Sequence, residues 1–285
     1  MHNMFLRFPG GKPKALTFSY DDGVVQDKRL AQLFDKYGLK ATFNFSGEGS
    51  RKYNHSKEDI QEYFLSKGHE VAVHGAFHRA NGNLRAIEGI REVLDCRLEL
   101  EEKCGQIIRG MAYPGTGITL MDGFGNYQQI RNYLQDLGIV YARTLGGDND
   151  SFLLPSDFYA WMPSVHHSNP KTGDYVDKFL ALDLSVNTYQ ERRGPRLLYI
   201  WGHSYEFDRS DNWDFMEEIC AKLSNNEEIW YATNMEIYDY VQAYKSLHHS
   251  ADGHMVYNPS LLTVWMDVDG KLYSVAPGQT IRITE

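Results

Sequence analysis

The stretch Ala15-Leu16-Thr17-Phe18-Ser19-Tyr20-Asp21-Asp22-Gly23 joins an apolar run, typical of a buried β-strand, to two carboxylates at the point where that strand should end. The same order, an apolar strand followed by polar side chains, recurs at His74 and His78 and again at His203. In a parallel β/α barrel the carboxyl ends of the strands share one mouth, where catalytic groups gather. Two carboxylates and three histidines meeting at such a mouth predict a metal-dependent hydrolase.

Strand and helix patterns alternate along most of the chain, which is typical of a repeated βα unit. The predicted strands are 15–20, 40–45, 70–73, 106–111, 139–143, 159–163, 196–201 and 228–232. The predicted helices are 25–37, 56–68, 84–104, 126–137, 213–223 and 235–247. Because no Pro-, Gly- or Ser-rich linker interrupts the series, we expect one α/β domain, a single distorted (β/α)7-8 barrel, over residues 1–247.

Residues 248–285 have a different pattern, with short strands and an Asp269-Gly270 turn signal. They predict a linker and a small β-hairpin extension packed on the barrel. The linker contains His248, His249 and His254, which we expect to be solvated. An alternative is that the extension forms a sugar-binding flap.

Composition excludes several classes of function. The chain has 285 residues, of which 42% are hydrophobic, and a formal net charge of −9. No run of Lys or Arg is long enough to follow a phosphate backbone, so nucleic acid is not an expected partner. No apolar stretch could span a bilayer, and the first residues lack the pattern of a secretion signal. We expect a cytoplasmic protein, although a secreted chain without its leader would have the same sequence.

The cysteines agree with a reducing compartment. Cys96, Cys104 and Cys220 leave one thiol unpaired whichever pair is joined, and Cys96 and Cys104 are too far apart on one helix to bridge. We therefore expect buried free thiols.

Each of these motifs, taken by itself, is weak evidence for a metal site. A His-x-x-x-His pair such as His74 and His78 often arises by chance, and an Asp-Asp-Gly after a strand is commonly a turn that caps the next helix. A histidine such as His203 is more often a hydrogen-bonded structural residue than a catalyst. Their combination favours a metal site, because two adjacent carboxylates near a barrel mouth are costly without a cation.

With these motifs in this order, the chain resembles the polysaccharide deacetylases, carbohydrate esterase family 4 with its NodB homology domain. The family's first motif corresponds to Thr17-Phe18-Ser19-Tyr20-Asp21-Asp22-Gly23, with two residues interposed, and the second to His74-Gly75-Ala76-Phe77-His78. The third is represented loosely by Arg109-Gly110-Met111-Ala112-Tyr113-Pro114-Gly115, and the late motif by Trp201-Gly202-His203. The resemblance runs from about residue 14 to residue 232 and implies a deacetylase-like barrel.

The resemblance also implies roles for these residues. Asp22, His74 and His78 would hold one divalent ion, usually zinc, with cobalt, nickel or manganese also compatible. Asp21 would be the general base and His203 the general acid, and Arg109 would pair with Asp21 and hold it ionised. A backbone N–H in the 113–116 loop would help to stabilise the oxyanion.

Several positions depart from the family pattern. Gly75 replaces a Ser or Thr that braces the histidine loop, Gly115-Thr116 stands where Tyr-Gly is expected, and Trp201 replaces an aliphatic residue. The fourth motif has no clear counterpart; its candidates are Asp148, Asp150 and Trp161. We expect the substrate to contact residues of the mouth, with Tyr113, Pro114, Gly115, Trp161, His166, His167 and Trp201 as candidates.

The expected function is therefore removal of acetyl groups from N-acetylated sugars or polysaccharide, with release of acetate. O-deacetylation is compatible with the same site. Two alternatives are hydrolysis of another C–N bond, such as a cyclic amide, and a non-catalytic carbohydrate-binding protein. Retention of both Asp21 and His203 argues against the latter, because binding alone needs neither a base nor an acid.

Overall fold

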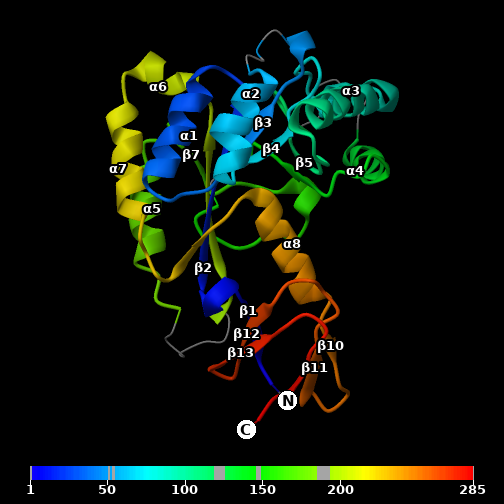
Figure 1. Ribbon diagram of the computed structural model, residues 1–285, viewed down its shortest axis with the longest axis vertical. Helices are drawn as coiled ribbons and strands as arrows, with labels where there is room; N and C mark the ends of the chain where they lie inside the picture. Colours follow the sequence, from blue (N-terminus) through cyan, green and yellow to red (C-terminus); the bar gives the residue numbers. More distant parts are fainter. Residues whose placement is uncertain are drawn as a thin grey trace.

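The structure, a computed structural model, describes residues 2–50, 52, 55–118, 126–145, 149–184 and 193–284. Figure 1 shows a large α/β part and, below it, a smaller part built of β-strands that holds both chain termini. None of the helices among these residues is long and apolar enough to cross a bilayer. The three cysteines are free and buried, as expected.

The centre of the α/β part is an eight-stranded sheet with β6-β5-β4-β3-β2-β8-β7 as its main order, and β9 also pairs with β2. All of these pairings are parallel. The strands are β2 (Lys14–Asp22), β3 (Ala41–Phe45), β4 (Glu70–Val73), β5 (Gly110–Ala112), β6 (Tyr141–Arg143), β7 (Val165–His166), β8 (Arg196–Gly202) and β9 (Ile229–Tyr231). The sheet curls into a parallel (β/α) half-barrel, which confirms the predicted fold class.

Helices cover the outside of this sheet (Figure 1). They are α1 (Gln26–Lys36), α2 (Lys57–Asp59), α3 (Ala86–Cys104), α4 (Tyr127–Asp136), α5 (Thr172–Leu180), α6 (Tyr205–Ser210), α7 (Trp213–Leu223) and α8 (Asn234–Lys245). Local sequence sets several of their ends. Ser56 and Thr233 form capping boxes that begin α2 and α8, and the left-handed Gly105 ends α3.

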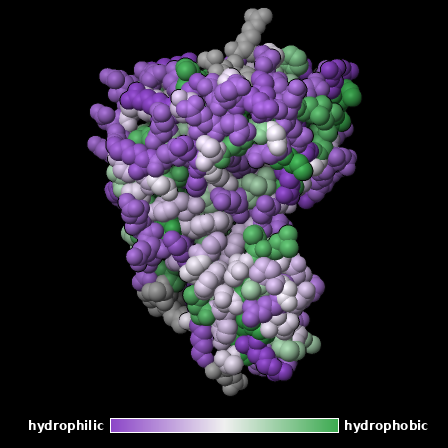
Figure 2. Space-filling model, viewed as in Figure 1, coloured by the Kyte–Doolittle hydropathy of each residue, from purple (hydrophilic) through white to green (hydrophobic). Residues whose placement is uncertain are grey.

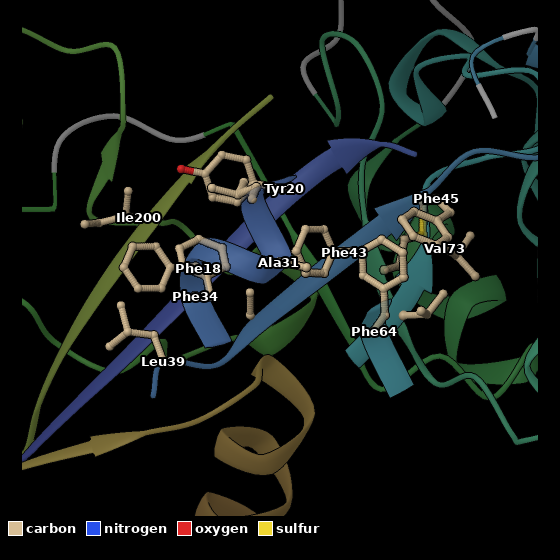
Figure 3. Close-up of a cluster of buried hydrophobic side chains, with 14 of the residues drawn as sticks. Phe18, Tyr20, Ala31, Phe34, Leu39, Phe43, Phe45, Phe64, Val73 and Ile200 are labelled. Carbon is tan, nitrogen blue, oxygen red and sulfur yellow. The ribbon is translucent and has the colours of Figure 1, made fainter. Parts of the chain in front are cut away.

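The largest hydrophobic cluster lies between the sheet and its helices, and Figure 3 shows part of it. The Phe34 ring of α1 stacks on Phe18 of β2 at a centroid distance of 4.6 Å, and Phe43 of β3 meets Phe64 edge-on at 4.7 Å. All four rings are fully buried. Each contributes roughly 1.5–3 kcal/mol by burial, so this cluster fixes β2 and β3, whose carboxyl ends carry polar side chains.

The smaller part contains two antiparallel sheets. One joins β1 (Met4–Arg7), β12 (Val264–Val268) and β13 (Lys271–Val275); the other joins β10 (His248–His249), β11 (Met255–Tyr257) and β14 (Thr280–Arg282). The β12–β13 hairpin turns at Asp269-Gly270, where both residues have positive φ, as the sequence predicted. Because β1 pairs with β12, this extension takes strands from both ends of the chain.

The extension lies where β2 begins, at the opposite end of the sheet from the carboxyl ends of the strands (Figure 1). It therefore does not form a flap over the mouth. Figure 2 shows the molecule hollowed on one side between the two parts. Trp230, Gln242 and Leu261 help to line a cavity of about 810 Å³.

The predicted strand at 159–163 is wrong. The chain instead forms a 3-10 turn at Phe158–Ala160, whose Tyr159 N–H donates to the side chain of Asp157. Only an isolated bridge between Trp161 and Arg143 remains. The polar Asp157 side chain offers the backbone a local hydrogen bond that competes with strand pairing. Three observed elements were not predicted from the sequence: β7, which follows this turn in the chain, and the helices α5 and α6.

Candidate active site

Asp21 and Asp22 end β2 and are almost completely buried, with 1% and 0% exposure. Successive side chains of a strand normally point to opposite faces. Here Asp22 has φ of +87° and Gly23 has φ of +75°, so the backbone turns sharply as the strand ends. As a result both carboxylates lie near His74: Nε2 of His74 is 3.8 Å from Oδ2 of Asp21 and 3.6 Å from Oδ1 of Asp22.

The predicted metal ligands come together. Nε2 of His78 lies 3.0 Å from Oδ1 of Asp22, and one ligand atom from each of Asp22, His74 and His78 lies within 4.8 Å of the others. Residues four apart share one face of a helical turn, but His74 and His78 do not lie on a helix. They meet through a loop in which Gly75 and His78 have positive φ, and their rings are edge-on at 4.9 Å.

The chemistry of these three residues fits a divalent cation. Oδ1 of Asp22 is buried and accepts no hydrogen bond from the residues that the structure describes, although two imidazoles face it. His74 donates through Nδ1 to the carbonyl of Ala112 at 2.9 Å, which leaves Nε2 directed at the cluster. Burial lowers the pKa of His74 to about 4, so the ring is neutral near pH 7 and can act as a ligand.

Glu92 of α3 braces the histidine loop, a role that sequence reasoning did not foresee. Its buried carboxylate accepts the Phe77 N–H at 3.0 Å and pairs with Nε of Arg79 at 2.5 Å. A Cβ at Gly75 would lie 2.9 Å from Oε2 of Glu92 and 3.2 Å from Cγ of Pro114. Gly75 therefore stands in place of the expected Ser or Thr because the loop is held by Glu92 and has no space for a side chain.

Lys52 also contacts the cluster, and no motif predicted this. Its Nζ is 2.9 Å from Oδ2 of Asp22 and 3.4 Å from Nε2 of His78. Burial raises the pKa of Asp22, but His78, His74 and Lys52 lower it by more, so the pKa stays below its usual range. Asp22 is consequently an anionic ligand at any pH near neutral.

Asp21 is paired with Arg143, not with Arg109. The Arg143 guanidinium is fully buried, donates to Oδ2 of Asp21 and lies 4.3 Å from the Trp201 ring, while Asn44 donates to Oδ1 at 2.9 Å. Burial raises the pKa of Asp21, but Arg143, His74 and His203 together more than offset this and keep it below its usual value.

The expected role of Arg109 fails because of its position. Arg109 precedes β5, so it lies at the amino end of the sheet, away from the mouth, and it pairs with Asp239 at 3.5 Å. Arg143 ends β6 and therefore reaches the mouth. Its place at the end of the predicted strand 139–143 was the signal that could have identified it.

His203 follows β8, on the same mouth as Asp21 and Asp22. Its Nδ1 lies 3.1 Å from Oε1 of Glu206, three residues further along and within α6. Burial lowers the pKa of His203, but Glu206, Asp21 and Asp22 raise it above its usual value. These carboxylates therefore favour the protonated form of the ring. Glu206 was missed because no expected motif included it.

The expected substrate contacts divide into two groups. Tyr113 and Trp161 belong to the core: Tyr113 donates through its hydroxyl to the Tyr159 carbonyl and through its N–H to the Arg143 carbonyl, and Trp161 packs edge-on against Tyr199. His166 and Trp201 lie near His203, with ring centroids 6.1 Å and 6.0 Å from its ring, and the buried His167 contacts Glu206. Pro114 packs beside Gly75, and Gly115 is exposed with φ of +58°.

The candidates for a fourth motif do not form one. Asp150 pairs with Lys178 at the surface, and Trp161 is in the core. Asp148 lies outside the described residues. Arg143 and Glu206, which contact the two proposed catalytic residues, come from other elements of the mouth.

Comparison with known proteins agrees with this geometry. The family model of polysaccharide deacetylase matches residues 9–142. A solved structure from Mycobacterium smegmatis, provisionally described as a polysaccharide deacetylase, is 18% identical with a TM-score of 0.61 and covers 84% of this chain and 94% of its own. The comparison with curated proteins finds no match.

Two further solved structures share the fold. An allantoinase is 15% identical, with a TM-score of 0.59 and coverage of 81% of this chain and 91% of its own. A family 4 acetyl xylan esterase from Clostridium thermocellum, in complex with a cobalt ion, is 15% identical, with a TM-score of 0.50 and coverage of 79% and 90%. The family match therefore covers a little less than half of this chain, residues 9–142, and the solved structures show that the chain shares their fold.

Proposed function

We propose that this protein is a metal-dependent hydrolase that removes acetyl groups from N-acetylated sugars or polysaccharide and releases acetate. One observation carries the proposal. A largely buried Asp-His-His cluster, in which one carboxylate oxygen accepts no hydrogen bond from the described residues, lies beside Asp21, whose pKa is lowered, and His203, whose pKa is raised. Amide hydrolysis needs an activated water, a base to take its proton and an acid for the poor leaving group, and this mouth offers a candidate for each.

Asp22, His74 and His78 would hold the ion, most fittingly zinc, although cobalt, nickel or manganese suit the same donors. When bound, such an ion supplies Lewis acidity that lowers the pKa of water and polarises the acetyl carbonyl. The remaining steps belong to side chains of the chain itself.

Asp21 accepts the proton of the attacking water. Arg143 and Asn44 occupy its two oxygens, so it stays ionised and fixed in orientation. His203 donates its proton to the departing nitrogen, and Glu206 holds Nδ1 so that Nε2 is the atom available to the substrate. Trp201 and His166 border this space, where their rings could pack against a sugar face.

The test combines metal content with acetate release from acetylated chito-oligosaccharides and acetylated xylan. Asp22→Ala should bind one ion fewer per chain than the wild type, and His78→Ala likewise. Asp21→Asn should keep its metal but lose turnover by roughly 10²- to 10⁴-fold. Asp150→Ala, which removes a surface carboxylate, is the matched control and should change neither measurement.

Unchanged metal content in Asp22→Ala would contradict the ligand set, and appreciable turnover in Asp21→Asn would contradict the base. Hydrolysis of a cyclic amide is the second candidate, because an allantoinase shares the fold. Ring opening of such a substrate without acetate release from any sugar would favour it over the deacetylase.

A further inference from the structure

We infer that the mouth holds a second divalent-cation site, formed by His166, His167 and Glu206. One ligand atom from each lies within 4.8 Å of the others. Nε2 of His167 is 2.9 Å from Oε2 of Glu206, and Nε2 of His166 is 3.4 Å from the same oxygen. The donor set, two imidazoles and one carboxylate, matches that of the first cluster.

The two clusters share an unusual feature. Oε2 of Glu206 is buried and receives no well-aligned hydrogen bond from the described residues, although His167 approaches it as closely as His78 approaches Oδ1 of Asp22. Here an imidazole nitrogen and a carboxylate oxygen lie close together without being aligned as hydrogen-bond donor and acceptor. In such a pair the lone pairs of both atoms can point at one shared position, where a cation would bind. A buried unpaired carboxylate oxygen is otherwise costly, and a cation between these atoms removes that cost.

The rings are held in place by their surroundings. His167 packs nearly parallel to both Tyr20 and Phe207, at centroid distances of 5.6 Å and 4.3 Å, and those two rings also contact each other. A Cβ at Gly202 would come within 2.0 Å of Nδ1 of His167, so only glycine at this point of β8 admits the ring. A site that is rigid before its ligand arrives loses little entropy on binding.

His166 has a partner that suits a ligand. Its Nδ1 is 2.7 Å from Oγ of Ser168, to which it can donate and so leave the Nε2 lone pair for a cation. The Ser168 backbone N–H also approaches Nδ1, at 3.2 Å, and favours the other tautomer, in which Nε2–H faces Glu206. The competing arrangement is thus a metal-free network in which Glu206 accepts hydrogen bonds from the two imidazole rings.

Imidazole nitrogens favour a borderline transition-metal ion such as zinc or cobalt over magnesium or calcium. Glu206 is also the partner of His203, through its other oxygen, Oε1. A cation on Oε2 would therefore be separated from the proposed general acid by a single carboxylate, and it would fix the orientation of that carboxylate.

The experiment counts zinc ions in full-length protein that has been equilibrated with zinc and freed of excess metal. The wild type should hold two ions per chain, Asp22→Ala one, His166→Ala one, and the double variant none. His249→Ala removes an exposed histidine far from the mouth and should keep both ions. Glu206→Gln is a second test that conserves shape and should also lose one ion.

A second readout uses cobalt. In Asp22→Ala, cobalt should give a visible absorption band that disappears in the double variant. One ion in the wild type and none in Asp22→Ala would overturn the inference, as would two ions in a folded His166→Ala. These outcomes do not depend on turnover: two ions without acetate release would overturn the proposed function alone.

Discussion

The neighbouring carboxylates Asp21 and Asp22 differ chemically because of the single residues that face them. Asp21 is closed off by Arg143 and Asn44, whereas Oδ1 of Asp22 faces two imidazoles and no hydrogen-bond donor. Identical side chains acquire different roles when their surroundings differ. This division supports a base at Asp21 and a ligand at Asp22.

Substitution of Arg143 tests whether this single residue determines the properties of Asp21. Arg143→Gln leaves a buried Asp21 without its cation, so the free energy of unfolding should fall by about 3 kcal/mol. Turnover should fall on the order of a hundred-fold, because Asp21, the proposed base, loses its fixed orientation. Denaturant titration and acetate release measure both effects.

Arg109→Gln is the matched control. Its pair with Asp239 is solvent-exposed, so removal should change the unfolding free energy by less than about 1 kcal/mol and leave turnover unaffected. Equal effects of the two substitutions would show that Arg143 has no special relation to the base.

At the scale of secondary-structure elements, Glu70 at the start of β4 connects several strands and helices that are distant in sequence. Its carboxylate accepts hydrogen bonds from Thr42 in β3, Tyr141 in β6 and the Met235 N–H in α8. These contacts lie at the end of the sheet opposite the mouth and fix the position of α8 against the strands. Burial raises the pKa of Glu70 to about 7, despite these three donors.

The raised pKa predicts how stability depends on pH. Between the ordinary pKa of 4.5 and about 7, the folded protein binds more protons at Glu70 than the unfolded chain does. The stabilisation is complete below pH 4.5 and is lost as the pH rises through about 7, amounting to at most about 3 kcal/mol. Glu70→Gln should lack this loss, as urea titrations at pH 5 and pH 8 would show. Parallel pH profiles of the two proteins would contradict the assignment.

The whole molecule is held together across the ends of the chain. Asp267 of β12 pairs with Arg7 of β1 and with Arg193, and Arg7 in turn donates to the Arg193 carbonyl at 2.7 Å. The carboxylate and both guanidiniums are largely buried. This ion-pair network connects the extension to the segment that precedes β8, far from the mouth.

Asp267→Ala should therefore act on stability and not on chemistry. Two buried guanidiniums would lose their partner, so the unfolding free energy should fall by about 3 kcal/mol, while metal content stays unchanged. Lys178→Ala, which breaks an exposed pair with Asp150, should cost less than about 0.5 kcal/mol. Thermal unfolding and metal analysis compare the variants; loss of bound metal in Asp267→Ala would mean that the extension supports the mouth.

Much of the site could be predicted from local sequence. An apolar run shows where a strand ends, and the carboxyl ends of parallel strands converge, so Asp21, Asp22, His74, His78 and His203 were expected in one place and lie there. The fold class followed from the same alternation of strands and helices. These inferences need only the periodicity of the backbone and the direction of the strands.

Only the tertiary structure decided which side chains pair with those residues. Arg143 reaches Asp21 across 122 positions of the chain, and Arg7 reaches Asp267 across 260. Neither contact leaves a local pattern, because each depends on how strands are ordered and how far each extends. Glu206 lies three residues from His203, yet its importance comes from His166 and His167, which another strand brings to it. The sequence by itself determined which chemical groups meet at the mouth; the packing of distant elements decided which of them pair, and so which remain available for the proposed cations.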